Sequence, residues 1–182
     1  MMNMRKLVTS IASLALVLAM VAAPVQSSAD SGAATYDYII GSALGGGPAI
    51  AIAENGDTVE IDGAGVLSIH PKSVAGGGTF IHMDPSGAVV AEGTWTADKL
   101  ISFDGYGCGG DGFPDAFCGG RAIIGVTLYI GETPIAKGVL QVDCLIGDKI
   151  PASATEGVRL NVKDLLNFNE EVSGFTVLIL ED

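Results

Sequence analysis

The sequence predicts an all-β protein built from antiparallel strands. Short runs in which apolar and polar residues alternate recur from Tyr36 to the C-terminus, and this alternation is typical of strands with one buried face. Turns that contain glycine or proline separate the runs at short intervals. No strongly periodic helical segment lies between them, which favours hairpins over strands joined by crossover helices.

The expected strands are short apolar or alternating runs bounded by these turns. They are Tyr36 to Ala43, Ala49 to Ala53, Thr58 to Asp62, Val66 to His70, Thr79 to Met83, Ala88 to Thr96, Leu100 to Tyr106, Arg121 to Ile130, Ile135 to Ile146, Val158 to Val162 and Phe175 to Leu180.

Three connections contain explicit turn chemistry. Asp84-Pro85-Ser86-Gly87 places proline where φ is preset and glycine where a left-handed residue is needed. Glu54-Asn55-Gly56-Asp57 has the same character, and Gly131-Glu132-Thr133-Pro134 lies between two long runs. Each of these segments predicts a hairpin between the strands that flank it.

The predicted architecture is an antiparallel β-sandwich, with a closed or partly closed antiparallel β-barrel as the alternative. Glycines in or beside strands, such as Gly93 and Gly138, fit sharp bends in either one. The run Phe175 to Leu180 is apolar on both faces at its end, so it should lie centrally or be covered by a partner. Lys163 to Val172 is the one candidate helix, and its Asn and Asp residues fit a loop equally well.

Residues 1–29 have the features of a secretory signal peptide. Arg5 and Lys6 precede the apolar run Leu7 to Ala23, and Ser27-Ser28-Ala29 supplies a small-residue exit site. The uninterrupted part of the run is shorter than the roughly 20 residues that span a bilayer. We therefore expect cleavage near Ala29, a single all-β domain over residues 30–182, and a secreted, periplasmic or cell-envelope protein whose mature chain does not insert into a membrane.

The chain is acidic, and this limits its partners. Its 9 basic and 21 acidic residues give a formal charge of -12. Loss of Arg5 and Lys6 with the leader leaves 7 basic against 21 acidic residues, or -14. Nucleic acids and anionic lipid surfaces are disfavoured, because both require clustered Lys and Arg. An extracellular or envelope protein or a glycan remains as the expected partner.

Three cysteines in an exported chain predict one disulfide and one free thiol. Cys108 and Cys118 flank a glycine-rich segment that a bridge would close, whereas Cys144 alternates with apolar residues and points to the buried face. We expect a Cys108–Cys118 disulfide and a buried Cys144. A pairing of Cys144 with either of the other two stays open.

Signals for nucleophilic and transition-metal chemistry are weak. The sequence lacks the Gly-x-Ser-x-Gly pattern and a paired-histidine zinc motif, and His70 and His82 are the available bases. A histidine alone on a strand is more often packed or solvated than catalytic. An electron-transfer copper site is disfavoured because no His or Met follows Cys144, although a His70–His82 metal pair stays open.

Calcium is the one cofactor that the acidic segments suggest. Asp104, Asp111 and Asp115, with glycine carbonyls between them, could supply hard oxygen ligands, although their spacing does not match an EF-hand and a solvated acidic loop is the simpler interpretation. Glycoside hydrolysis requires two carboxylates in one cleft, and the sequence shows no such pair, although Glu92 and Asp104 are individual candidates for a catalytic carboxylate. Trp95, on the same strand as Glu92, is either a sugar-stacking platform or a core residue.

Two functional hypotheses follow. The first is a noncatalytic exported β domain that binds a partner or takes part in a surface assembly, with the apolar C-terminal strand available for pairing with a neighbour. The alternative is a small secreted carbohydrate-active hydrolase that uses paired carboxylates. Neither hypothesis specifies a partner or a substrate.

Overall fold

The computed structural model describes residues 33–110 and 112–181 of the chain. The predicted leader, residues 1–29, and the predicted start of the mature chain at Asp30 lie outside these ranges. Within them, no helix has the length and apolar character needed to cross a bilayer.

The described residues form ten strands and one 3-10 turn. The strands are β1 (Thr35–Ile40), β2 (Ala49–Ala53), β3 (Thr58–Ser68), β4 (Ser73–Met83), β5 (Val89–Gly110), β6 (Phe113–Ile130), β7 (Thr133–Cys144), β8 (Gly157–Val162), β9 (Leu166–Ser173) and β10 (Thr176–Leu180), and the 3-10 turn η1 is Gly41–Leu44.

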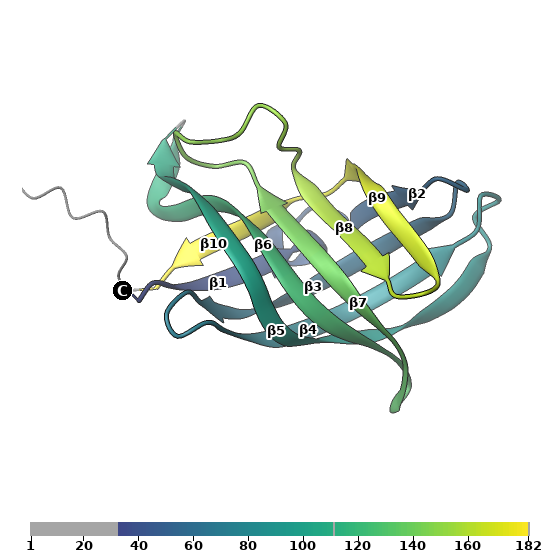
Figure 1. Ribbon diagram of the computed structural model, residues 1–182. Helices are drawn as coiled ribbons and strands as arrows, with labels where there is room; N and C mark the ends of the chain where they lie inside the picture. The colour runs from purple at the N-terminus through teal and green to yellow at the C-terminus, as the bar shows by residue number, and fades with distance from the viewer. Residues whose placement is uncertain (1–32, 111, 182) are drawn as a thin grey trace, which may run out of the picture. The chain divides into compact units, whose positions relative to one another are not determined.

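Eight consecutive strands, β2 to β9, form a closed ring of hydrogen-bonded pairs. Each is antiparallel to the next along the chain, and β9 returns to pair with β2. Figure 1 shows β7, β8 and β9 following one another along this ring. The antiparallel all-β prediction is confirmed, and a ring with continuous pairing has the form expected of the partly closed barrel alternative.

Strands β1 and β10 complete the sheet beyond β2 and β9. β1 continues along β3 past the segment that pairs with β2, with Ile40 opposite Gly63 and Thr35 opposite Ser68. β10 then lies between β1 and β6. The apolar C-terminal strand therefore lies between two strands, as expected, and its backbone pairs with β1 along its length and with β6 at Leu178 and Ile179. We do not propose strand addition at β10.

Glycine explains why two predicted strands are joined into β3. Gly63 and Gly65 suggested a break after Asp62, yet the strand runs on to Ser68. A Cβ on Gly63 would overlap Cζ2 of Trp95. Glycine at this position therefore allows the indole ring to pack directly against the backbone of β3. Here glycine marks a close approach within the sheet.

The segment Lys163 to Val172, expected as a helix or a loop, is instead a turn followed by strand β9. Phe168 is its buried side chain, whereas Asn167, Asn169 and Glu170 point outward. β9 pairs with β8 on one side and β2 on the other. Backbone hydrogen bonds to two neighbours therefore hold a strand whose composition alone does not indicate one.

The interior of the ring is filled by alternating side chains over most of its length. Ile61, Phe80, Trp95 and Val126 surround a void of ≈ 10 Å³ together with Leu128, Leu140 and Leu160. A void of that size lies at the lower limit for one water molecule. The strands therefore enclose a packed core here, and any ligand must bind elsewhere along the ring.

The cysteine predictions are confirmed. Cys108 and Cys118 form a disulfide between β5 and β6, and Cys144 is a buried free thiol. Burial raises the pKa of Cys144 to about 12, and its Sγ donates to the carbonyl oxygen of Cys118 at 3.3 Å. The disulfide is compatible with the predicted extracellular or periplasmic location, because such bonds persist in oxidising compartments.

Replacing Cys108 and Cys118 together by alanine should lower the free energy of unfolding by about 2 to 3 kcal/mol. The bridge joins residues 10 apart, and closing a loop of that length removes this much entropy from the unfolded chain. Urea denaturation should detect the loss in the double variant, and a reductant should produce it in the parent only. An equal midpoint for parent and variant would contradict the expectation.

Candidate functional site

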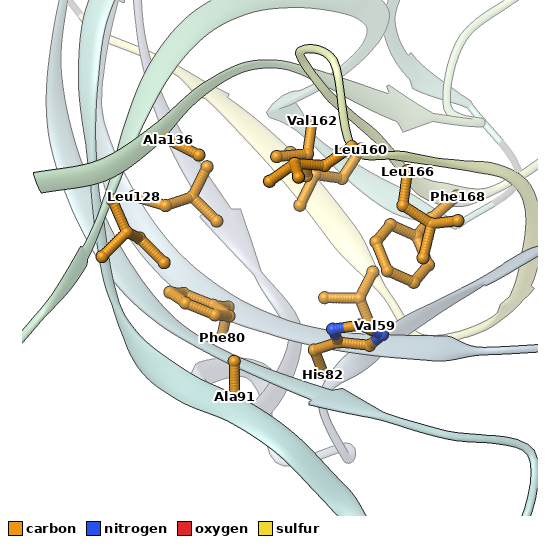
Figure 2. Close-up of a pocket in the computed structure, with 12 residues that line it drawn as sticks. Val59, Phe80, His82, Ala91, Leu128, Ala136, Leu160, Val162, Leu166 and Phe168 are labelled. Carbon is orange, nitrogen blue, oxygen red and sulfur yellow. The ribbon is translucent and has the colours of Figure 1, made fainter.

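A cavity of ≈ 260 Å³ opens at one end of the strand ring. Every strand from β3 to β9 contributes to its wall, and Figure 2 shows Phe80 and His82 facing Leu160 and Val162 across it. The lining residues are Val59, Phe80, His82, Ala91, Leu128, Ile135, Ala136, Leu160, Val162, Leu165, Leu166 and Phe168. Among these side chains, His82 is the one with polar atoms.

The floor and the rim of the cavity differ. Phe80, Leu128 and Leu160 form its floor and also line the small void above Trp95, so the cavity rests on the packed core. At the rim, Ile135 is 46% exposed and Leu165 is 73% exposed. The entrance is therefore apolar and open to solvent, as expected for a site that accepts an apolar ligand.

His82 is held in the wall by a short contact with Asp57. Its Nε2 lies 2.7 Å from Oδ2 of Asp57, and the two side chains are 20% and 14% exposed. Its ring also lies edge-on to Phe168, with 5.3 Å between centroids. The imidazole thus has one polar and one aromatic neighbour, and both limit its rotation.

The turn between β2 and β3 places Asp57 at this position. The amide of Gly56 donates to the carbonyl oxygen of Ala53 at 2.9 Å, and the amide of Asp57 donates to Oδ1 of Asn55 at 3.2 Å. Gly56 has φ of +88°, a left-handed value that glycine adopts without steric cost. The predicted turn over residues 54–57 is confirmed, and it directs the carboxylate toward β4.

The register of β3 and β4 places His82 on the inner face. His82 pairs with Val59, and Phe80 pairs with Ile61. Val59, Ile61 and Phe80 are buried, and because side chains alternate along a strand, His82 points inward as Phe80 does. The pairing of β3 with β4 therefore brings Asp57, which directly precedes β3, next to His82 at the cavity.

Sequence reasoning did not select this pair. The sequence suggests His82 as a base or as a metal ligand paired with His70, and it suggests Asp57 only as a turn residue. Two signals were present in the sequence: the alternation of His82 with Phe80, and the turn that ends at Asp57. Finding the pair required the register between the strands, which a single sequence does not provide.

The predicted carbohydrate-binding and catalytic residues lie elsewhere. Trp95 is 3% exposed, and its Nε1 donates to the carbonyl oxygen of Asp62 at 3.0 Å. Glu92 and Asp104 are exposed on the same strand, twelve residues apart. A strand rises about 3.3 Å per residue, which separates them far beyond the roughly 5 to 9.5 Å between paired catalytic carboxylates.

The two histidines are also separated. His70 lies in the turn that leads into β4, and His82 lies near the other end of that strand. In residues 33–110 and 112–181, no group of three His, Cys, Asp or Glu side chains could hold a metal ion. For the suggested calcium ligands, Asp104 and Asp115 are exposed and Asp111 lies outside the described residues, so calcium binding stays a prediction.

A buried charged cluster lies on the outer face of the sheet, away from the cavity. Asp143 is fully buried and accepts hydrogen bonds from Tyr106 Oη and Arg121 Nε, both at 2.8 Å, and from Gln141 Nε2 at 3.2 Å. Burial raises the pKa of Tyr106 to about 12. With its carboxylate satisfied in this way, Asp143 has a structural role.

An apolar recess of ≈ 500 Å³ lies beside β10 and the start of β6. Phe113 and Phe175 are exposed there, and Glu156 is its charged member. The amide of Leu145 donates to Glu156 Oε2 at 2.7 Å, and the amide of Thr176 donates to Oε1 at 2.8 Å. Burial raises the pKa of Glu156. Both oxygens of this carboxylate already accept backbone hydrogen bonds that join a loop to β10, so Glu156 has a structural role. The cavity lined by His82 is therefore the better candidate site.

Comparison with known proteins identifies no relative of this chain. The chain matches no protein-family model, no curated protein and no solved structure.

Proposed function

We propose that this domain is a noncatalytic binding protein that takes up a small, mainly apolar molecule at the open end of its strand ring. The observation that carries the proposal is the ≈ 260 Å³ cavity, whose lining has one polar side chain held in place by a carboxylate. Ligand sites typically combine an apolar wall with a few fixed polar groups. The proposal adds a ligand class, a small apolar molecule, to the binding role expected from the sequence.

The volume indicates the size of the ligand. An apolar cavity of about 150 Å³ is sufficient for benzene, and typical sites for drug-sized ligands start at about 300 Å³. A cavity of ≈ 260 Å³ therefore suits a ring with a short alkyl chain, about ten non-hydrogen atoms. Long-chain lipids and oligosaccharides are too large to be enclosed in it.

Filling the cavity should abolish binding. Ala136 lies in the cavity wall on β7, and Ala136→Phe would place a ring where the ligand should lie. We expect butylbenzene to bind the parent protein with a micromolar to millimolar dissociation constant and to bind Ala136→Phe at least tenfold more weakly. Fluorescence of Trp95, the single tryptophan, which lies below the cavity floor, can report both titrations.

Ala88→Phe is the matched control. Ala88 is exposed in the turn between β4 and β5 and does not line the cavity, so the same added ring should leave the affinity unchanged. If the parent bound no such hydrocarbon, or if Ala136→Phe bound it as tightly as Ala88→Phe, the proposed function would be wrong.

A further inference from the structure

We infer that the ligand of this cavity is a neutral phenol or alcohol whose hydroxyl group donates a hydrogen bond to Nδ1 of His82. This inference rests on the proposed function and adds a chemical class to it. It depends on three features of the site: the Asp57–His82 contact, the side of the imidazole that faces the cavity, and the sign of the neighbouring charge.

Asp57 determines which ring nitrogen carries the proton. A carboxylate only accepts hydrogen bonds, so at 2.7 Å from Asp57 Oδ2 the Nε2 of His82 must be the donor. In a neutral imidazole the other nitrogen, Nδ1, is then an acceptor with a free lone pair. The carboxylate thereby fixes both the tautomer and the ring orientation, as a positioning residue.

The imidazole that carries the free nitrogen lines the cavity. Figure 2 shows its ring beside Val59, on the side of the cavity that faces Leu160 and Val162. Within the described part of the chain, Nδ1 has no hydrogen-bond partner, and no other lining side chain could supply one. An acceptor in an apolar wall gains most from a ligand that brings a donor.

Charge favours a neutral donor over an acid or a base. An anionic ligand would face the Asp57 carboxylate and a chain of formal charge -12. An ammonium group would lose its hydration in a wall with a single acceptor. A hydroxyl group matches the one free lone pair and leaves no donor or acceptor unsatisfied beyond its own oxygen, so an alkylphenol or a similar alcohol fits best.

Two isomers of the same formula test this inference. 4-Propylphenol can donate a hydrogen bond, whereas 4-ethylanisole, an ether of equal size, can only accept one. We expect calorimetry at about pH 8, below the ordinary pKa of a phenol, to show that the parent protein prefers the phenol by about tenfold, the effect of one hydrogen bond of roughly 1.4 kcal/mol.

Variants at both members of the pair should remove this preference. His82→Phe removes the acceptor, and Asp57→Asn removes the charge that fixes the tautomer. In each variant the affinity for the phenol divided by the affinity for the ether should fall from about ten to a value between about one and three. Val162→Ala is the control, because it alters an apolar part of the wall across the cavity from His82 and should weaken both isomers alike while keeping the ratio. If His82→Phe binds neither isomer, Asp57→Asn decides the question.

The outcomes separate this inference from the proposed function. Binding of both isomers with equal affinity to the parent protein, or a preference that survives Asp57→Asn, would overturn the inference and leave the apolar binding role intact. Failure of butylbenzene and of both isomers to bind the parent would overturn the proposed function itself.

Discussion

Replacing Asp143 by alanine should lower the free energy of unfolding by about 2 to 4 kcal/mol, because the buried Tyr106 hydroxyl and the partly buried Arg121 guanidinium would both lose the carboxylate to which they donate. Asp143 is fully buried and accepts hydrogen bonds from Tyr106, Arg121 and Gln141. The variant would leave Arg121, whose side chain is 28% exposed, without its carboxylate. That loss is a large part of the 5 to 15 kcal/mol typical of a whole domain.

The pairing with Arg121 contributes to this effect, and a second variant can show it. Replacing Asp143 by leucine and Arg121 by methionine together removes both charges, so the double variant should recover much of the stability lost in Asp143→Ala. Lys163→Ala serves as a control, because its contact with Asp164 is exposed and 3.9 Å long and should contribute less than about 0.5 kcal/mol.

Urea denaturation followed by circular dichroism would measure these differences. A loss below about 1 kcal/mol in Asp143→Ala would show that water or a rearranged side chain satisfies Arg121, and the structural role assigned to the cluster would be wrong.

Local features of the sequence predicted the elements that depend on local chemistry. The turn over residues 54–57 and the turn over residues 84–87 connect paired strands as expected. The hydroxyl of Ser86 donates to Asp84 Oδ1 at 2.6 Å, and the amides of Ala88 and Ser86 donate to the same oxygen at 3.0 and 2.8 Å. These hydrogen bonds lower the pKa of Asp84. In such turns the residues that set φ and the residues that close the hydrogen bonds are adjacent in sequence, so the pattern is sufficient.

Features that depend on distant segments were harder to predict. β9 carries a single fully buried side chain, Phe168, and it is a strand because β8 and β2 hydrogen-bond to it on both sides. Closure of the ring between β2 and β9 joins segments more than 100 residues apart. Neither feature leaves a periodic signal in the sequence, because backbone hydrogen bonds are available to every residue except proline.

The candidate site illustrates the same division. Alternation along β4 predicts that His82 and Phe80 share a face, and turn chemistry predicts Asp57 at the end of a loop. The contact between His82 and Asp57, and the cavity that opens beside Ala136, both arise from the ring as a whole. Residues selected for their chemical type alone, such as Glu92 and Asp104, lie on the exposed side of β5.

Replacing Trp95 by alanine should destabilise the domain by about 3 to 5 kcal/mol, the usual cost of truncating a buried aromatic side chain. The indole is 3% exposed and borders the core void together with Ile61 and Leu140. Its loss would also remove the hydrogen bond from Nε1 to the carbonyl oxygen of Asp62, which adds to the cost.

Trp95→Phe separates these two contributions. Phenylalanine keeps most of the apolar volume but cannot donate to Asp62, so we expect a loss of about 1 to 2 kcal/mol, well below that of Trp95→Ala. Glu92→Gln, a change on the exposed face of the same strand, should have almost no effect. Urea denaturation followed by circular dichroism suits this comparison, since both Trp95 variants lack the fluorescent side chain. A cost for Trp95→Ala no larger than that for Glu92→Gln would mean that Trp95 is not part of the core. The alternative role predicted for Trp95, a sugar-stacking platform, would then be favoured.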